Sequence, residues 1–392
     1  MGSKKQKRDR SKFDKNFVAL MLHTVVPVLK HKYGVERNEY LRADEESFLL
    51  LFNHVTDLDM VWIMDAFHRQ IYCLGSEHIA RFPLAGKLLN TFFAPILIKK
   101  GSSGMAAVME MHRCLKAGNS ILMSPEGILC AAGRTGELVP STAAVIKKLH
   151  CNVITVRIHG GYLTKPRWAK TVRKGQITVE KIAEYSKDSI ALMDPAEFQA
   201  IIEKDLYEDA YAYNETAKIA YKGKNLAEGI ECQLYLCPSC KKLATLHSLK
   251  NDFFCDCGLK GTIDEYGMIS GEGFDFKTVT EWDEWQESEL KKMPLPKDTE
   301  TVIVSNPNLS IKEIKEGHKE SVIGTGTLQL TSREISVGEV RIPLSEISDV
   351  AMVSYGILLI YTKDKHYYEI RDKKNRYPGV LYKKLIARIK ED

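Results

Sequence analysis

Apolar and polar positions alternate between residues 47 and 160 with the periods of strands and helices. Short apolar runs predict strands at 47–52, 92–98, 120–124 and 152–158. Apolar residues at helical spacing predict helices at 58–68, 105–117 and 141–149. Strands that alternate with helices predict an α/β layer architecture, in which catalytic groups follow the ends of strands.

The N-terminal segment, residues 1–34, combines basic residues with an amphipathic helix. Residues 12–31 place apolar side chains at near-helical spacing, and Pro27 is expected to kink or end this helix. The basic residues are Lys4, Lys5, Lys7, Arg8, Arg10, Lys12 and Lys15. Two interpretations stay open: the helix docks on the domain core, or it lies with its basic leader on an anionic membrane surface.

The pattern changes after residue 301 to short alternating segments. They predict strands at 301–304, 326–330, 334–337, 341–343, 357–362 and 365–370, followed by a helix at 379–390. Several strands closed by one C-terminal helix resemble a β-barrel-like pleckstrin-homology domain. Such domains dock on lipid or on another protein, and a purely structural role is equally open.

Length and composition describe an ordinary globular protein of more than one domain. The 392 residues exceed a single compact core, and 44% are hydrophobic and 27% charged. A net charge of +5 is too small to indicate a nucleic-acid partner. No run approaches the roughly 18 apolar residues of a membrane-spanning helix, and no signal peptide is evident. The nine cysteines, odd in number, indicate a reducing, cytoplasmic environment.

A candidate catalytic pair follows the first predicted strand. The apolar run ends at Asn53-His54, and Asp59 follows five residues later at the start of the next predicted helix. A histidine acts as a general base when a carboxylate fixes its tautomer and stabilises the imidazolium. A structural alternative is a capping box in which Thr56 caps the helix. The same His-x-x-x-x-Asp spacing recurs by chance at His247.

Two further strand ends carry candidate binding residues. Lys99-Lys100 precedes two glycines and a predicted helix start at 105, an arrangement that suits a phosphate group. An ordinary solvated lysine pair in a turn explains it equally well. Pro125-Glu126-Gly127 places an acidic residue at the tip of a turn.

The order of these motifs resembles the glycerolipid acyltransferase family, which includes the lysophosphatidic acid acyltransferases. Asn53-His54 with Asp59, the basic pair, Pro125-Glu126-Gly127 and the apolar strand at 153–158 carry the resemblance over roughly residues 35–225. The resemblance implies a mixed sheet flanked by helices, with His54 as general base and Asp59 as its orienting partner. It implies substrate-binding roles for Asn53, Lys99, Lys100, Glu126 and Gly127.

The chain departs from the family pattern at two positions. The family's Phe-Pro-Glu-Gly-Thr-Arg reads Ser-Pro-Glu-Gly-Ile-Leu at residues 124–129, so the arginine is missing in place. Arg134 follows a few residues later as a possible substitute cation. The proline of the family's fourth motif is Thr155 here. These differences leave the acceptor's identity open.

The reaction implied by the resemblance is acyl transfer at the membrane surface without a covalent enzyme intermediate. A fatty acyl group would move from an acyl thioester, acyl-CoA or acyl carrier protein, to the hydroxyl of a lysophospholipid such as 1-acyl-glycerol-3-phosphate. Because both substrates are lipid-linked, we expect a cytoplasmic protein that binds the membrane peripherally. The alternative is a non-catalytic lipid-binding scaffold that keeps the fold.

Four cysteines in two close pairs predict a zinc ribbon. Cys237 and Cys240 are separated by fourteen residues from Cys255 and Cys257. Tetrahedral Zn²⁺ needs two such turns facing each other, and four protein ligands make the site closed and structural. A redox-active cysteine pair is the alternative. Residues 230–265 show no dense basic and aromatic surface, so we expect no nucleic acid as a partner.

These patterns together predict five segments. They are the N-terminal segment 1–34, an acyltransferase domain 35–228, a zinc ribbon 229–272, a linker helix 273–300 and a pleckstrin-homology-like domain 301–392.

Overall fold

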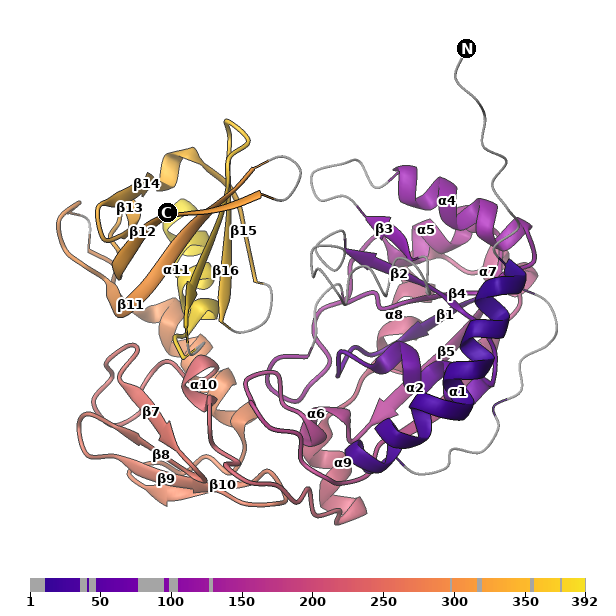
Figure 1. Ribbon diagram of the computed structural model, residues 1–392, viewed down its shortest axis with the longest axis horizontal. Helices are drawn as coiled ribbons and strands as arrows, with labels where there is room; N and C mark the ends of the chain where they lie inside the picture. The colour runs from indigo at the N-terminus through magenta and orange to yellow at the C-terminus, as the bar shows by residue number, and fades with distance from the viewer. Residues whose placement is uncertain are drawn as a thin grey trace. The chain divides into compact units, whose positions relative to one another are not determined.

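The computed structural model describes most of the chain, and its contacts divide the chain into two units (Figure 1). Unit 1 comprises residues 1–164 and 174–219, and unit 2 comprises residues 165–173 and 220–392. The described residues are 11–35, 41, 47–76, 95–98, 105–126, 130–296, 298–315, 319–352, 356–373 and 376–391. Within them, no helix is both long enough and apolar enough to span a bilayer.

Unit 1 is built on a six-stranded sheet with the order β3-β2-β4-β1-β5-β6. Its strands are β1 (Phe48–Phe52), β2 (Tyr72–Ser76), β3 (Ile96–Ile98), β4 (Ile121–Met123), β5 (Asn152–His159) and β6 (Thr178–Tyr185). All neighbours are parallel except β5 and β6. The mixed α/β sheet expected from the sequence is therefore confirmed. Its strand β6 was not predicted, and β2 was not predicted either.

Helices cover both faces of this sheet. They are α1 (Ser11–Tyr33), α2 (Asp59–Phe67), α4 (Met105–Lys116), α5 (Thr142–Leu149), α6 (Gly161–Thr164), α7 (Lys187–Leu192), α8 (Pro195–Leu206) and α9 (Ala210–Ala217). One core joins Leu49 and Leu51 of β1 to Ile146 of α5 and Phe198 of α8. β1 is buried along its whole length, as expected for a strand with helices on both sides. Side chains at its end are therefore held rigidly.

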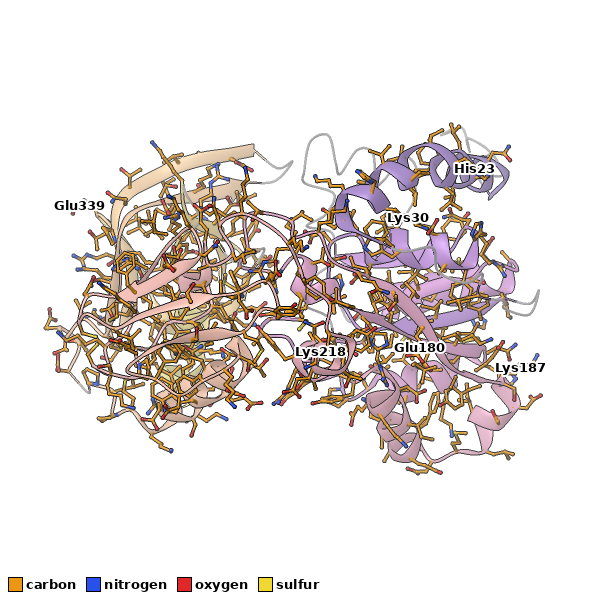
Figure 2. All side chains as sticks on the ribbon, turned by 90° about the horizontal axis from the view of Figure 1, so that it is seen from below. His23, Lys30, Glu180, Lys187, Lys218 and Glu339 are labelled. Carbon is orange, nitrogen blue, oxygen red and sulfur yellow. The ribbon has the colours of Figure 1, made fainter. Side chains whose placement is uncertain are left out.

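Helix α1 packs on this domain with one face and exposes apolar residues on another. Val18, Val26 and Tyr33 are buried, and Lys30 forms an ion pair with Asp65 of α2 at 2.6 Å. Figure 2 shows Lys30 and His23 on this helix. The outward side chains include Leu20, Val25 and Val28, which are 60%, 49% and 69% exposed. Docking is thus observed, and an apolar face remains exposed.

Unit 2 begins with a small four-stranded antiparallel sheet. Its strands, in the order β10-β9-β8-β7, are β7 (Leu246–Leu249), β8 (Asp252–Cys255), β9 (Lys260–Ile263) and β10 (Ile269–Glu272), and a 3-10 turn η2 (Ile230–Cys232) precedes them. Helix α10 (Val279–Lys292) follows, as predicted for a linker helix. Trp282 of α10 is buried, and its indole N–H donates to the carbonyl of Leu236 at 3.0 Å.

The C-terminal part of unit 2 is a seven-stranded antiparallel sheet packed on one helix. The strands are β11 (Val304–Lys315), β12 (Lys319–Leu330), β13 (Glu334–Val337), β14 (Val340–Pro343), β15 (Ile347–Met352), β16 (Ile357–Thr362) and β17 (Tyr367–Asp372), with η4 (Leu344–Glu346) and α11 (Gly379–Glu391). Their order is β14-β13-β12-β11-β17-β16-β15. Strand β15 was not predicted, and β11 extends far beyond the expected 301–304.

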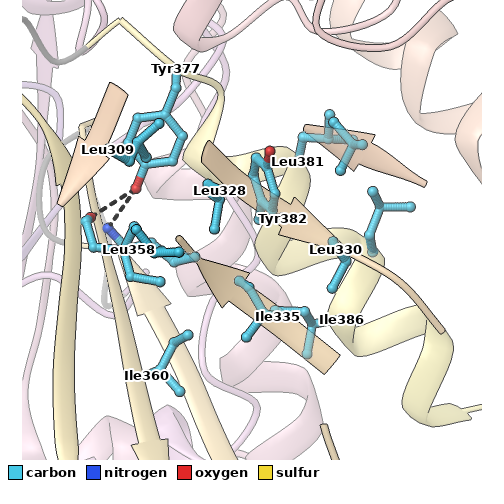
Figure 3. Close-up of a cluster of buried hydrophobic side chains, with 14 of the residues drawn as sticks. Leu309, Leu328, Leu330, Ile335, Leu358, Ile360, Tyr377, Leu381, Tyr382 and Ile386 are labelled. Atoms are coloured by element: carbon cyan, nitrogen blue, oxygen red, sulfur yellow. Dashed lines mark hydrogen bonds between the residues drawn. The ribbon is translucent and has the colours of Figure 1, made fainter. Parts of the chain in front are cut away.

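The core of this sheet lies between the strands and α11 (Figure 3). Leu328 and Leu358 face Leu381 and Tyr382 of the helix, and all four are fully buried. The hydroxyl of Tyr377 donates to the carbonyl of Ile370 at 2.8 Å and accepts from the N–H of Leu358 at 3.2 Å. An antiparallel sheet closed by a C-terminal helix agrees with the predicted element order. The pleckstrin-homology likeness stays a prediction.

Candidate active site and cysteine cluster

The end of β1 is joined to the end of β5 by the side chain of Asn53. Its amide N–H donates to the carbonyl of Ile158 at 3.1 Å, and its Oδ1 accepts from the N–H of Ile158 at 2.7 Å. Asn53 is completely buried. These two hydrogen bonds to the backbone of Ile158 therefore fix the point at which the chain leaves the sheet, one residue before His54.

His54 and Asp59 are in direct contact. Nδ1 of His54 lies 2.7 Å from Oδ2 of Asp59. The carboxylate also accepts the N–H of Val55 at 2.8 Å, the N–H of Thr56 at 2.9 Å and the hydroxyl of Thr56 at 2.7 Å. An ionised carboxylate can only accept hydrogen bonds, so the ring nitrogen that it contacts must be an N–H donor. Nδ1 of His54 therefore carries the hydrogen, and Nε2 is the basic atom.

The capping-box alternative is present only in part: Asp59 accepts the N–H of Thr56 at 2.9 Å, but Thr56 is not the N-cap. Helix α2 begins at Asp59 with Leu58 as its N-cap, and no side chain caps it. The Thr56 hydroxyl accepts the N–H of Leu58 at 3.2 Å within the turn. Asp59 therefore organises the turn and orients the imidazole at the same time.

A second histidine at a strand end, His159, has both ring nitrogens bonded and so serves as a structural contrast to His54. His159 ends β5, and its two ring nitrogens lie 3.0 Å from Glu208 and 2.9 Å from Glu180. Its ring stacks on Tyr213, and the two carboxylates outweigh burial and raise its pKa. In His54, by contrast, no described residue bonds Nε2, and the side chain is 30% exposed.

Glu126 holds the backbone of the histidine turn. One carboxylate oxygen accepts the N–H of His54 at 2.7 Å, and the other accepts the N–H of Gly136 at 2.7 Å. Burial raises the pKa of this carboxyl to about 7, against the opposing effect of those two N–H groups. The turn predicted at Glu126 thus lies beside His54. Sequence spacing gave no signal for either backbone bond.

Gly161 is a further residue on which the site depends. A Cβ atom at this position would lie 2.5 Å from a methyl group of Val55 and 3.1 Å from the methyl group of Thr56. Helix α6 thus approaches the histidine turn as closely as a glycine allows. Gly160 and Gly161, directly after the predicted strand 152–158, are the local sequence feature that corresponds to this close approach.

Arg134, the proposed substitute cation, is already paired. Its Nε donates to Oδ2 of Asp209 at 2.7 Å, and the side chain is 39% exposed. The structure brings Arg134 and Glu126 into one loop region, since the N–H of Thr135 bonds Glu208 and the N–H of Gly136 bonds Glu126. The remaining predicted residues Lys99, Lys100 and Gly127 lie outside the described residues.

The four cysteines predicted as metal ligands meet in unit 2. All four sulfur atoms lie within 4.8 Å of one another. Sγ of Cys237 is 3.7 Å from that of Cys257, and Sγ of Cys240 is 3.8 Å from that of Cys255. Four thiolates held about 2.3 Å from a tetrahedral zinc ion would be about 3.8 Å apart, so the donor set fits the ion.

The pKa values of the cluster thiols shift in opposite directions, and burial raises those of Cys237 and Cys255. The N–H of Leu259 lowers the pKa of the Cys257 thiol to about 7. Metal ligation requires the thiolate form. All nine cysteines of the chain are free thiols. Neither His247 nor Cys232 joins the cluster, and His247 bonds Asp256 at 2.8 Å instead.

Comparison with known proteins finds a family match over the segment that contains the histidine turn. Residues 32–159 match the model of the Acyltransferase family, which confirms the predicted resemblance for this segment. Among solved structures, the chain is similar to the 1-acyl-sn-glycerophosphate (LPA) acyltransferase PlsC from Thermotoga maritima. The identity is 18%, the TM-score is 0.43, and the likeness covers 54% of this chain and 84% of that one. No curated protein matches the chain.

Proposed function

We propose that the chain is an acyltransferase that moves a fatty acyl group from an acyl thioester to the hydroxyl of a lysophospholipid. The observation that carries this proposal is the bond between Nδ1 of His54 and Asp59, just after the fully buried strand β1, on a side chain that is 30% exposed and whose Nε2 has no described partner. The family match over residues 32–159 supports acyl transfer as the reaction. The acceptor and the donor, acyl-CoA or acyl carrier protein, are the finer parts of the proposal.

The proposed step uses His54 first as a base and then as an acid. Nε2 takes the proton of the acceptor hydroxyl while its oxygen attacks the thioester carbonyl carbon. Asp59 stabilises the imidazolium through Nδ1–H. When the tetrahedral intermediate collapses, the C–S bond breaks, the new ester forms, and the proton passes from Nε2 to the leaving thiolate. No group on the protein becomes covalently acylated.

Acceptor binding is assigned to the residues around this turn. We infer that Glu126 acts on the acceptor indirectly, because its two oxygens already accept the N–H groups of His54 and Gly136. Lys99, Lys100 and Gly127 remain proposed contacts of the acceptor. Arg134 is a weaker candidate for a phosphate contact, since Asp209 already neutralises part of its charge.

Peripheral membrane contact is proposed for the outward face of α1. Leu20 and Val28 are exposed on a helix that also carries Lys32 and two histidines. Replacing both Leu20 and Val28 by glutamate should weaken sedimentation with anionic liposomes without unfolding the protein, because neither side chain is buried. Unchanged sedimentation would rule out this face as the anchor.

The second unit is proposed to have a stabilising and docking role. A structural zinc ion bound by Cys237, Cys240, Cys255 and Cys257 would hold the small sheet, whose own core is limited. The C-terminal sheet with α11 is proposed to be a pleckstrin-homology-like domain.

The decisive test is turnover by the pure protein. It is incubated with radiolabelled acyl-CoA and a panel of lysophospholipids, beside the variants His54→Ala and His247→Ala. His247 is the matched control, because it also has an aspartate five residues later and a carboxylate partner in the structure. We expect one acceptor to be acylated by the wild type and by His247→Ala, but not by His54→Ala.

Two results would count against the proposal. Equal turnover by the wild type and His54→Ala would reject the catalytic role of the histidine. Binding of lysolipid without turnover on any acceptor, with either acyl-CoA or acyl carrier protein as donor, would favour the non-catalytic scaffold.

A further inference from the structure

The histidine turn is supported by segments that are far apart in the sequence, and a closed ring of contacts joins them. On one side of the turn, the side chain of Asn53 bonds the backbone of Ile158 at the end of β5. On the other side, the carboxylate of Glu126 accepts the N–H of His54 and the N–H of Gly136, each at 2.7 Å. The rest of the ring consists of residues that have no part in the proposed acyl transfer.

Residues 133–135 pair in antiparallel fashion with residues 208–210 and form the far side of the ring. The N–H of Thr135 donates to the carbonyl of Glu208 at 3.0 Å, and the N–H of Glu208 donates to the hydroxyl of Thr135 at 2.8 Å. Because Gly136 follows Thr135 directly, this pairing holds the N–H of Gly136 in place for the carboxylate that supports the histidine turn.

The side chain of His159 closes the ring. Its Nδ1 lies 3.0 and 2.9 Å from the two carboxylate oxygens of Glu208. Only 6% of the Glu208 side chain is exposed, so its charge needs a donor from the protein. The other ring nitrogen lies 2.9 Å from Glu180, which is 58% exposed (Figure 2), so water can replace that second bond but not the first. The members of the ring, in order from the base, are His54, Asn53, Ile158, His159, Glu208, Thr135, Gly136 and Glu126.

The surroundings of His159 favour a protonated ring with one fixed orientation. Burial lowers the pKa of His159, but the carboxylates of Glu208 and Glu180 outweigh burial and raise it. Both nitrogens of a protonated imidazole donate hydrogen bonds, so each carboxylate receives one. The ring of Tyr213 stacks on the imidazole with the centroids 4.3 Å apart. An imidazole held at two edges and at one face keeps Glu208 in one position.

We propose that His159 is a positioning residue for acyl transfer, which acts on His54 through Glu208 and Glu126. This inference rests on the function proposed for His54. By holding Glu208, His159 fixes residues 133–136, and they fix the carboxylate that accepts the N–H of His54. A displacement of the reacting groups by about 1 Å can lower a rate about 10²-fold. His159 transfers no proton itself, because both of its ring nitrogens are occupied.

The experiment compares turnover by full-chain variants of His159 that keep one donor or the other. The side-chain amide of asparagine places an N–H group where Nδ1 lies, whereas that of glutamine reaches the position of Nε2. His159→Asn should therefore keep the bond to Glu208 and a kcat within about threefold of the wild type. His159→Gln and His159→Ala should lose that bond and lower kcat about tenfold or more, with the KM for the acyl thioester unchanged. Glu180→Gln is the matched control and should keep the wild-type kcat, because Glu180 is largely exposed.

Stability and kinetics together separate positioning from a merely structural role. Urea unfolding gives the folded fraction of each variant under the assay conditions, and kcat is expressed per folded molecule. A structural role predicts lower midpoints with an unchanged kcat in every folded variant of His159, and this result would overturn the proposal. Equal kcat values in folded His159→Asn and His159→Gln would overturn it as well, because the contact with Glu208 would then not matter. Failure of all three variants to fold would assign His159 to stability alone and reject the positioning role.

A measurement that needs no turnover keeps this inference separate from the proposed function. In protein that carries isotope-labelled histidine, the Nδ1–H proton of His54 is the low-field resonance that disappears in His54→Ala. It should be sharp in the wild type and in His159→Asn but broadened in His159→Gln, because the turn is no longer held in one position. If the wild type acylates no lysophospholipid, the proposed function fails, whereas this resonance still decides the positioning role. An unchanged resonance in His159→Gln would overturn that role.

Discussion

Replacing Asp59 by asparagine tests the central pair most sharply. The carboxylate receives four donors: the ring Nδ1–H of His54, the N–H of Val55, and the N–H and hydroxyl of Thr56. Asparagine keeps the shape but has only one oxygen, and its NH₂ group cannot accept. If the oxygen faces Thr56, the NH₂ group opposes the N–H of Val55 and donates to Nδ1 of His54. If the oxygen faces His54 instead, the NH₂ group opposes the N–H of Thr56, which then has no acceptor.

The two orientations differ in their cost to activity but share a cost to stability. Each leaves one backbone N–H of a buried turn unpaired, which destabilises the fold by about 1–3 kcal/mol. The first orientation keeps the hydroxyl bond of Thr56, so we expect it to dominate. It moves the ring hydrogen to Nε2, so the basic atom is lost. The same change in the Ser-His-Asp triad lowers kcat about 10⁴-fold, or about 5.5 kcal/mol, and we expect a comparable loss here.

The assay compares kcat of Asp59→Asn with the wild type and with Asp57→Asn, and measures urea unfolding of all three. Asp57 is exposed two residues away, so its variant should keep both activity and stability. Circular dichroism at the assay temperature confirms that Asp59→Asn is folded. A folded Asp59→Asn variant with more than a tenth of wild-type turnover would refute the assignment of the tautomer and with it the role of Asp59.

Three further predictions concern the surroundings of this pair and the cysteine cluster. Burial raises the pKa of Glu126 to about 7, so ionisation of this group disfavours folding as the pH rises from about 4.5 to 7. Glu126→Gln loses about 1–3 kcal/mol at every pH, because its NH₂ group cannot accept one of the two backbone N–H groups, but the wild type should lose up to about 3 kcal/mol relative to the variant over that window in urea unfolding. A wild-type-minus-variant difference that is flat with pH would contradict this. The new methyl group of Gly161→Ala should clash with Val55, lower the free energy of unfolding by about 1–3 kcal/mol and reduce turnover at least tenfold. In the control Gly136→Ala the new methyl group meets nothing nearer than 3.5 Å, so this variant should keep its stability and turnover. Equal turnover in the two variants would show that the histidine turn can shift freely. Metal analysis should find about one zinc ion per chain, and Cys257→Ser should reduce it and lower the thermal midpoint; unchanged midpoints after complete removal of zinc would exclude a structural metal.

Most of the regular structure followed from the period of apolar residues, and the misses have physical causes. β1 and β5 are buried on both faces, so their apolar runs were unambiguous. β15 was missed because the ladder with β16 shifts register between Ile347 and Asp349, which breaks the alternation of apolar and polar positions. β11 was cut short at 304 because Pro307 and Asn308 read as a turn. In the structure Asn308 has φ 65°, and the strand resumes at Leu309 after a bulge.

The candidate site was predictable only where its groups are close in sequence. His54 and Asp59 lie five residues apart, so the strand, turn and helix brought them together as expected. Glu126 follows His54 by 72 residues, and its bond to the backbone of the histidine turn depends on β1 and β4 being neighbours in the sheet. The pairing of Arg134 with Asp209 spans 75 residues and had no signal in the local pattern.

Four described histidines lie next to carboxylates, and their surroundings explain why only one suits catalysis. His366 bonds Glu313 at 2.7 Å on the C-terminal sheet and is 47% exposed. His247 bonds Asp256 on an exposed hairpin, where both side chains are solvated and a surface pair contributes little. His159 is buried with both ring nitrogens bonded to carboxylates, so it has no atom left to accept a proton from a substrate. His54 has one nitrogen fixed by a fully satisfied buried carboxylate and no described partner at the other. A base needs this combination, because orientation requires burial of the partner whereas proton transfer requires access to the ring. The His-x-x-x-x-Asp spacing shared by His54 and His247 is therefore insufficient by itself to predict a general base. Only at His54 do a buried strand, a turn and the start of α2 hold the carboxylate against one ring nitrogen and leave the other without a described partner.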